Sequence, residues 1–100
     1  MEWLWTWGGK SFGYREGDCL WTHDGRHIGH FCDDEIYGAD GAYLGELRNK
    51  NRLITNIGKK GKRTSGFLPY PPRVGCVRYV DYVGYVIYVG YEDFPNPEDL

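Results

Sequence analysis

The chain has 100 residues, a formal net charge of -2 at pH 7 and 17% aromatic residues. This length allows one small domain with a core of its own and excludes a second domain with a linker. No apolar stretch approaches the ~20 residues of a membrane span, and the first residues lack the basic and apolar regions of a secretory signal. The three cysteines are too few for a disulfide framework, so we expect a cytoplasmic protein that does not bind membranes.

A repeat of 16 residues organises the first half of the chain, with Leu4, Leu20 and Ile36 in equivalent positions. In each copy an aromatic residue follows at once, and an Asp-Gly or Gly-Gly pair comes shortly afterwards. A degenerate fourth copy begins 17 residues later, at Leu53. Each copy is typical of a β-hairpin, because Asp-Gly and Gly-Gly pairs favour two-residue turns with positive φ.

A turn at Asp24-Gly25 fixes the register of the second hairpin and, by equivalence, that of the others. It predicts that Trp21 pairs with Ile28 and that Leu20 lies opposite Gly29. The corresponding pairs are Trp5 with Phe12, Leu4 with Gly13, Tyr37 with Leu44, and Ile36 with Gly45. Because glycine leaves room opposite each aliphatic residue, we expect a common centre formed by Leu4, Leu20, Ile36 and Leu53.

These patterns predict a single all-β domain over residues 1–100, with hairpin repeats at 4–18, 20–34 and 36–51. Residues 53–63 together with 74–91 are expected to form the degenerate fourth unit. A lone hairpin is marginally stable in water, whereas four around an axis bury a shared core. We therefore expect a radial or barrel-like arrangement with pseudo-fourfold symmetry, in which one or two C-terminal strands complete the fourth quarter. The alternative is an ordinary antiparallel meander whose repeat is a relic of duplication.

Two sequence runs carry a resemblance to a known family. They are Leu-Trp-x-x-Asp-Gly-Arg-x-Ile-Gly from Leu20 and Ile-Tyr-x-x-Asp-Gly-x-Tyr-Leu-Gly from Ile36. Together with the first copy they resemble the four-fold beta-flower domain of bacterial proteins, over residues 3–58. The resemblance implies a small hairpin-repeat domain and brings no catalytic residues, since the function of that family is largely uncharacterised. The fourth copy departs from the pattern, because Gly61 stands where the others have Phe, Ile or Leu.

Residues 48–63 carry seven basic side chains and no acidic one. Such a cluster in a chain rich in Trp and Tyr is typical of surfaces that bind a nucleic-acid backbone and stack its bases. The alternative is a solvated segment that faces the acidic turns and tail of the same molecule. The candidate anion-binding or nucleic-acid-binding residues are Arg48, Lys50, Arg52, Lys59, Lys60, Lys62 and Arg63.

The prolines between residues 64 and 72 predict a loop. Residues 74–91 are rich in Val and Tyr, which favours one or two long strands over a helix. Because both faces of such a strand are apolar, we expect it to be covered on both sides or to pair with another chain. The acidic tail at 92–100 is expected to lie extended along the surface. The candidate interaction-surface residues are Tyr79, Tyr82, Tyr85, Tyr88 and Tyr91.

Groups with catalytic or metal-binding chemistry are few. In the predicted hairpin His27 points to the face opposite His30, so Cys19 and His30, as cross-strand neighbours, supply at most two metal ligands. We therefore expect no metal and no cofactor. The segment around Lys59 and Lys60 lacks the glycine spacing of a phosphate-binding loop.

With no convergent catalytic set, our leading hypothesis is a small non-enzymatic interaction module that binds a protein partner or a second copy of itself. The alternative is single-strand nucleic-acid or polyanion binding through residues 48–63. A third hypothesis is an enzyme that uses Cys19 with His30.

Overall fold

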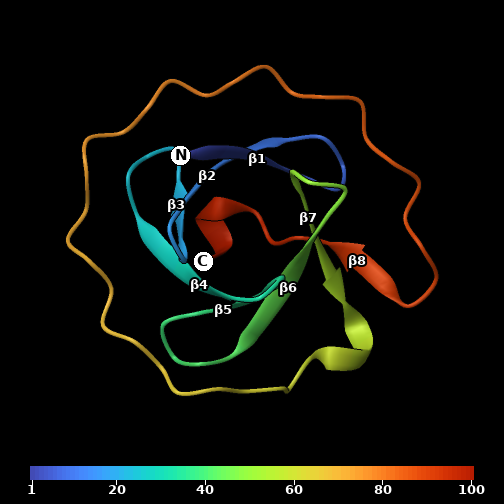
Figure 1. Ribbon diagram of the computed structural model, residues 1–100. Coiled ribbons are helices and arrows are strands. Elements are labelled where there is room, and N and C mark those ends of the chain that lie inside the picture. Colours follow the sequence, from blue (N-terminus) through green and yellow to red (C-terminus); the bar gives the residue numbers. More distant parts are fainter.

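Seven β-strands close into a barrel in the computed structural model of the chain, which describes residues 1–100 (Figure 1). Strands that follow one another in the chain pair antiparallel, and a parallel pair between the first and the seventh closes the ring. The predicted all-β, barrel-like fold is thereby confirmed, while its pseudo-fourfold symmetry stays a prediction. The strands are β1 (Glu2–Thr6), β2 (Ser11–Glu16), β3 (Cys19–Thr22), β4 (His27–Cys32), β5 (Glu35–Tyr37), β6 (Tyr43–Arg48) and β7 (Arg52–Asn56).

The barrel interior holds the predicted centre. Leu20 lies opposite Gly29, and the equivalent pairs in the other two hairpins are also present. Burial of one such side chain stabilises the fold by about 1.5–3 kcal/mol. Three phenylalanines join the four aliphatic residues, so the core cluster consists of Leu4, Phe12, Leu20, Phe31, Ile36, Leu53 and Phe94.

The hairpin tips differ from the predicted two-residue turns. Gly25 has a φ of 90° and donates its amide to the Thr22 carbonyl oxygen, whereas Asp24 does not adopt a positive φ. This arrangement is a longer loop with a glycine bulge, which inserts one extra residue. As a result Trp21 pairs with His27, and the predicted pair with Ile28 is wrong.

The same shift occurs in the first and third hairpins, where Trp5 pairs with Ser11 and Tyr37 pairs with Tyr43. Because a shift of one residue reverses the face of a strand, the bulged residues turn inward and the aromatic residues lie outside the core cluster. The residues that turn inward to join or pack against the core are Phe12, Ile28 and Leu44.

Residues 64–89, here named the belt, encircle the barrel as an extended chain without helix or strand (Figure 1, yellow to orange). The predicted strand over 74–91 is therefore wrong, except where its last residue begins β8 (Tyr91–Asp93). Side-chain exposure in the belt repeats every three residues, as in a polyproline II helix, with Val80 at 84% and Tyr82 at 47%. A strand would repeat every two residues.

Each hairpin tip holds the belt by a matching pair of backbone hydrogen bonds. Gly25 O accepts from Arg73 N, and His23 O accepts from Cys76 N. The tips thereby satisfy belt amides that would otherwise need a strand partner. The other two tips make equivalent pairs, which recur every 16 residues in the barrel and every nine residues in the belt. The further bonds run from Tyr82 N to Gly9 O, from Tyr85 N to Trp7 O, from Thr64 N to Gly41 O, and from Phe67 N to Ala39 O.

The prediction that the C-terminal tail lies extended along the surface is wrong, because the tail returns to the barrel. β8 pairs with the end of β7, and residues 94–100, here named the plug, follow it. Phe94 is 3% exposed within the core cluster, and Leu100 packs against that cluster. The short 3-10 helix η2 (Pro97–Asp99) lies inside the ring of strands in the view of Figure 1. The apolar residues Phe94 and Leu100 therefore anchor the otherwise acidic tail.

The degenerate fourth copy does not form a hairpin of its own. After β7 the chain enters the 3-10 helix η1 (Ile57–Lys59), whose N-cap Asn56 accepts a hydrogen bond from the Gly58 amide. No helix in the structure has the length and apolar character needed to cross a membrane.

Candidate functional site

The predicted interaction tyrosines form an aromatic layer between belt and barrel. Tyr82 stacks on Trp5 with ring centroids 4.0 Å apart, and Trp5 Nε1 donates to the Val80 carbonyl oxygen at 3.0 Å. Trp7 contacts Tyr85 in the same layer, at 4.9 Å. These contacts engage the inward faces of the tyrosines. The other members pack nearby: Tyr79 on Trp3, Tyr88 on Trp7, and Tyr91 on Tyr88.

The valines of the belt point outward. They occupy every third position and are between 84% and 103% exposed. Single exposed apolar residues are common on soluble proteins, whereas six at a constant three-residue spacing along one segment form a regular apolar set. The belt backbone beneath them is held by the hairpin tips, so the set is presented in a fixed arrangement. We name it the valine row: Val74, Val77, Val80, Val83, Val86 and Val89.

Arg52, a predicted anion-binding residue, is buried under the belt with 4% exposure. Its Nη2 donates to the Val83 carbonyl oxygen at 2.9 Å, and its guanidinium lies 4.3 Å from the centroid of the Tyr85 ring. Arg52 therefore fastens the belt to the barrel and is not available to an external anion.

Most of the other predicted cations face acidic groups of the same chain. Lys59 Nζ lies 2.8 Å from a Glu35 oxygen and 3.2 Å from a Glu46 oxygen, and Lys62 Nζ lies 2.9 Å from Glu35. Lys50 makes no hydrogen bond or ion pair. Nucleic-acid binding stays a prediction, with less free positive charge than the sequence suggests. The remaining pairs are Arg48 with Glu46, Lys60 with Glu92, and Arg63 with the Asp40 carbonyl oxygen.

The Glu35 cluster predicts acid sensitivity. Hydrogen bonds from Lys59 and Lys62 lower the pKa of Glu35 from 4.5 to about 2. Because the folded pKa is depressed, this stabilisation is complete above pH 4.5 and is lost as the pH falls towards 2. We expect Glu35→Gln to lower the free energy of unfolding at pH 7 by about 1–2 kcal/mol and to reduce its loss over that acid range. Urea denaturation at several pH values measures both effects.

Asp33→Asn is the matched control, because Asp33 is exposed and makes no ion pair in the structure. An equal response of both variants would contradict the assigned role of Glu35.

A cluster of one thiol and two imidazoles lies on the outer face of β3 and β4. Cys19 pairs with His30 across the strands, as predicted, and the ring centroids of His27 and His30 are 5.1 Å apart. The prediction that His27 points to the opposite face is wrong. The register shifts between Leu20 and Trp21 and leaves Ile28 as an extra, unpaired residue, which returns His27 to the face of His30. The ligand atoms of Cys19, His27 and His30 all lie within 4.8 Å of one another.

The belt covers the imidazoles of this cluster. Phe67 stacks on His30 with centroids 4.0 Å apart, and the Tyr70 amide donates to His27 Nδ1 at 3.0 Å. Burial lowers the pKa of His27, and the charge of His30 adds to this effect. Burial also raises the pKa of the Cys19 thiol, which works against a nucleophilic thiolate at neutral pH.

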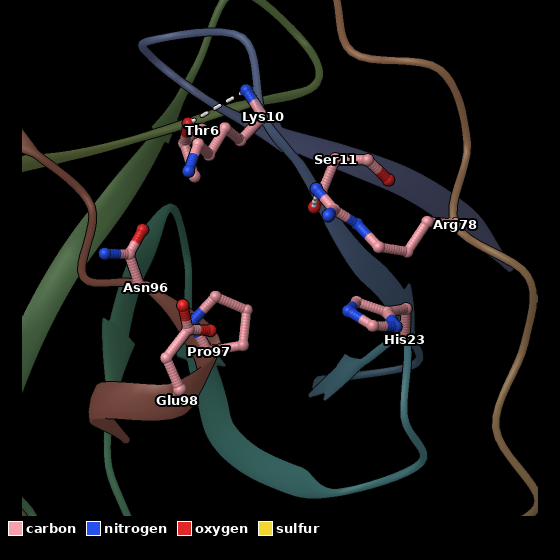
Figure 2. Close-up of a pocket in the computed structure, with 8 residues that line it drawn as sticks. All are labelled: Thr6, Lys10, Ser11, His23, Arg78, Asn96, Pro97 and Glu98. Atoms are coloured by element: carbon pink, nitrogen blue, oxygen red, sulfur yellow. Dashed lines mark hydrogen bonds between the residues drawn. The ribbon is translucent and has the colours of Figure 1, made fainter.

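A small polar cavity of about 50 Å³ lies between barrel, belt and plug. Figure 2 shows the plug residues Asn96, Pro97 and Glu98 on one side, and His23 and Arg78 on the other. Thr6, Lys10 and Ser11 complete the lining. The volume suits a few water molecules and not an organic ligand.

Sequence reasoning missed the valine row, the plug and the position of His27. Tyrosine at every third position was the visible signal for the belt, because a polyproline II helix also has three residues per turn. For His27 the Asp-Gly tip was ambiguous, since it suits both a two-residue turn and a longer bulged loop.

Comparison of the chain with models of protein families, with curated protein sequences and with solved structures gave no match. The resemblance to the four-fold beta-flower domain therefore stays a prediction.

Proposed function

We propose that the protein is a non-enzymatic interaction module whose contact surface is the valine row. The observation that carries this proposal is the exposure of six valines at constant spacing on a tethered backbone. Valine loses little side-chain freedom on binding because it is β-branched, and a backbone that is already ordered reduces the entropic cost of association.

A second copy of the chain is the partner that this surface favours. The belt curves around the barrel (Figure 1), so a second copy meets a short run of the row, such as Val77, Val80 and Val83. Identical side chains at constant spacing in such a run can pair with the same run of a second copy in the antiparallel orientation, as a twofold interface requires. The three hairpin tips bond to the belt at positions nine residues apart. This regular spacing supports a pseudo-fourfold arrangement of the whole domain, in which β7 and β8 take the place of a fourth hairpin.

The proposal predicts that the wild-type protein associates as its concentration rises, while the triple variant Val77→Thr, Val80→Thr, Val83→Thr stays at the monomer mass of 11.6 kDa. Threonine keeps the shape of valine and adds a hydroxyl that resists burial. Analytical ultracentrifugation over a concentration series measures the mass. At concentrations too low for the wild type to associate, the thermal midpoints of the two proteins should be equal, because these side chains are solvent-exposed in the monomer.

The matched control replaces the same three valines by isoleucine, which keeps the surface apolar and should preserve association. A wild-type protein that stays at the monomer mass at every concentration would refute self-association. Equal association of the threonine and isoleucine variants would show that another surface is responsible.

A further inference from the structure

The cluster of Cys19, His27 and His30 has the chemistry of a transition-metal site. Thiolate and imidazole are the preferred ligands of Zn²⁺, and three protein ligands with an open fourth position form a complete set for a reactive or exchangeable zinc. Their ligand atoms, within 4.8 Å of one another, need to approach by about 1 Å to meet the ligand spacing that zinc–ligand bonds of about 2.0–2.3 Å impose. Side-chain rotation on two adjacent strands provides that movement.

The ring atoms of the cluster are available for coordination. Phe67 covers the face of the His30 ring and leaves the ring edge, where the nitrogens lie, without a hydrogen bond. The Cys19 thiol takes part in no disulfide and no hydrogen bond. On the solvent side a shallow cleft, lined in part by Asp18, Tyr70 and Arg73, reaches Cys19 and His30. An ion therefore has a route to the donors.

His27 supplies the independent observation. The residue is 6% exposed, and its Nε2 is buried without any hydrogen-bond partner. A buried polar atom without a hydrogen-bond partner is destabilising, because it has lost water without gaining a replacement. Among the buried side-chain nitrogens and oxygens of the chain only two others lack a partner, and one of these belongs to Trp21, whose ring centroid lies 5.1 Å from that of His27. Two of the three buried side-chain nitrogens without a hydrogen-bond partner therefore lie in or beside the cluster.

The tautomer of His27 decides how an ion would enter. Because the Tyr70 amide donates to Nδ1, the proton of the neutral ring sits on Nε2. A metal at Nε2 requires that proton to move to Nδ1, and an Nδ1–H cannot face the Tyr70 N–H. A metal at Nδ1 displaces the same amide directly. Coordination by His27 therefore breaks the contact between His27 and the belt in either case.

We propose that Cys19, His27 and His30 bind a transition-metal ion of the Zn²⁺ class, and that this ion competes with the belt for the ring of His27. Metal binding replaces the hydrogen bond between the Tyr70 amide and His27 with a metal–nitrogen bond, and the neutral ring keeps its single N–H on the nitrogen that does not bind the metal. Loss of the amide contact at Tyr70 loosens the belt between the tips at Gly41 and Gly25, which hold it on either side.

The first test is titration of the full-length protein with Zn²⁺ under reducing conditions by isothermal calorimetry. We expect one site with a dissociation constant in the micromolar range or tighter. Cys19→Ser and His30→Ala should each weaken binding at least about tenfold. His23→Ala and Cys32→Ser are the matched controls, because both residues lie outside the cluster, and they should bind as wild type does.

Titration of the wild-type protein with Co²⁺ keeps the proposal testable even if a variant fails to fold, because a thiolate-to-cobalt charge-transfer band must appear. Absence of that band, absence of Zn²⁺ binding by wild type, or equal binding by wild type, Cys19→Ser and His30→Ala would overturn the metal site.

The second test addresses competition with the belt. Tyr70→Pro and Tyr70→Ala both remove the ring of Tyr70, and only proline also removes the amide N–H that occupies His27 Nδ1. We expect Tyr70→Pro to bind Zn²⁺ about fivefold more tightly than Tyr70→Ala, which corresponds to one ordinary hydrogen bond. Equal affinity of the two variants would overturn the competition.

Discussion

Gly9→Ala is expected to lower the free energy of unfolding by about 4 kcal/mol, because it ejects the belt from the first hairpin tip. A Cβ at Gly9 would lie 2.0 Å from the Tyr82 carbonyl oxygen, a separation that no rotation relieves. The displaced belt loses the bonds from Tyr82 and Tyr85 to the tip and the stacking of Tyr82 on Trp5. Urea denaturation measures the loss of stability, and hydrogen exchange at the Tyr82 and Tyr85 amides shows where the chain opens.

Gly61→Ala provides a matched control for backbone strain. Gly61 has a φ of 95°, close to the 93° of Gly9, and an added Cβ there meets no atom within 4 Å. It should lose only the strain of a left-handed alanine, about 1–2 kcal/mol. If the two alanine variants were equally stable, the contact between tip and belt would not hold the belt in place.

Phe94→Ala is expected to lower the free energy of unfolding by about 3–5 kcal/mol, the range for a large aromatic residue removed from a packed core. The Phe94 ring packs edge-to-face on Phe12, with centroids 5.2 Å apart. A Cβ on Gly45 would lie 2.6 Å from the Phe94 ring, so the ring packs directly on the Gly45 backbone, which has no side chain to fill the space that the ring leaves. Thermal and urea denaturation measure the effect.

Leu68→Ala is the control for Phe94→Ala, because Leu68 is apolar and 92% exposed. It should leave stability unchanged. A Phe94→Ala variant as stable as wild type would mean that the plug contributes nothing to the core.

Replacement of Arg26 should also lower the free energy of unfolding, because its guanidinium donates to the carbonyl oxygens of Pro97 and Leu100 at 2.7 and 2.9 Å.

Residues 74–89 form no strand, although their composition predicts one, because distant parts of the chain determine their conformation. Valine and tyrosine favour strands because they fit a pleated, half-buried surface. In the belt only the tyrosines are half-buried, against the barrel, and the valines are exposed. The belt tyrosines pack on the tryptophans in and just after β1, and the belt amides donate to the carbonyl groups of the hairpin tips. Trp5 and the belt carbonyl oxygen that it contacts are 75 residues apart in sequence. No pattern within the segment specifies such a partner.

The candidate metal site shows the same limit at smaller scale. The sequence placed Cys19 opposite His30, because cross-strand pairing follows from the position of the turn. The number of residues in that turn decided whether His27 joins them, and one extra residue reverses a face. The belt amide at Tyr70, which determines the tautomer of His27, comes from 43 residues away.

By itself the sequence determined the all-β class, the first three hairpins and their aliphatic centre, because strand alternation and the space that glycine leaves act between neighbours along and across a hairpin. Only the tertiary structure decided that seven strands close into a barrel, that Phe94 enters it and that the belt encircles it. The physical reason is that each of these depends on which distant surface offers buried area and free hydrogen-bonding groups. That surface exists only after the hairpins have assembled.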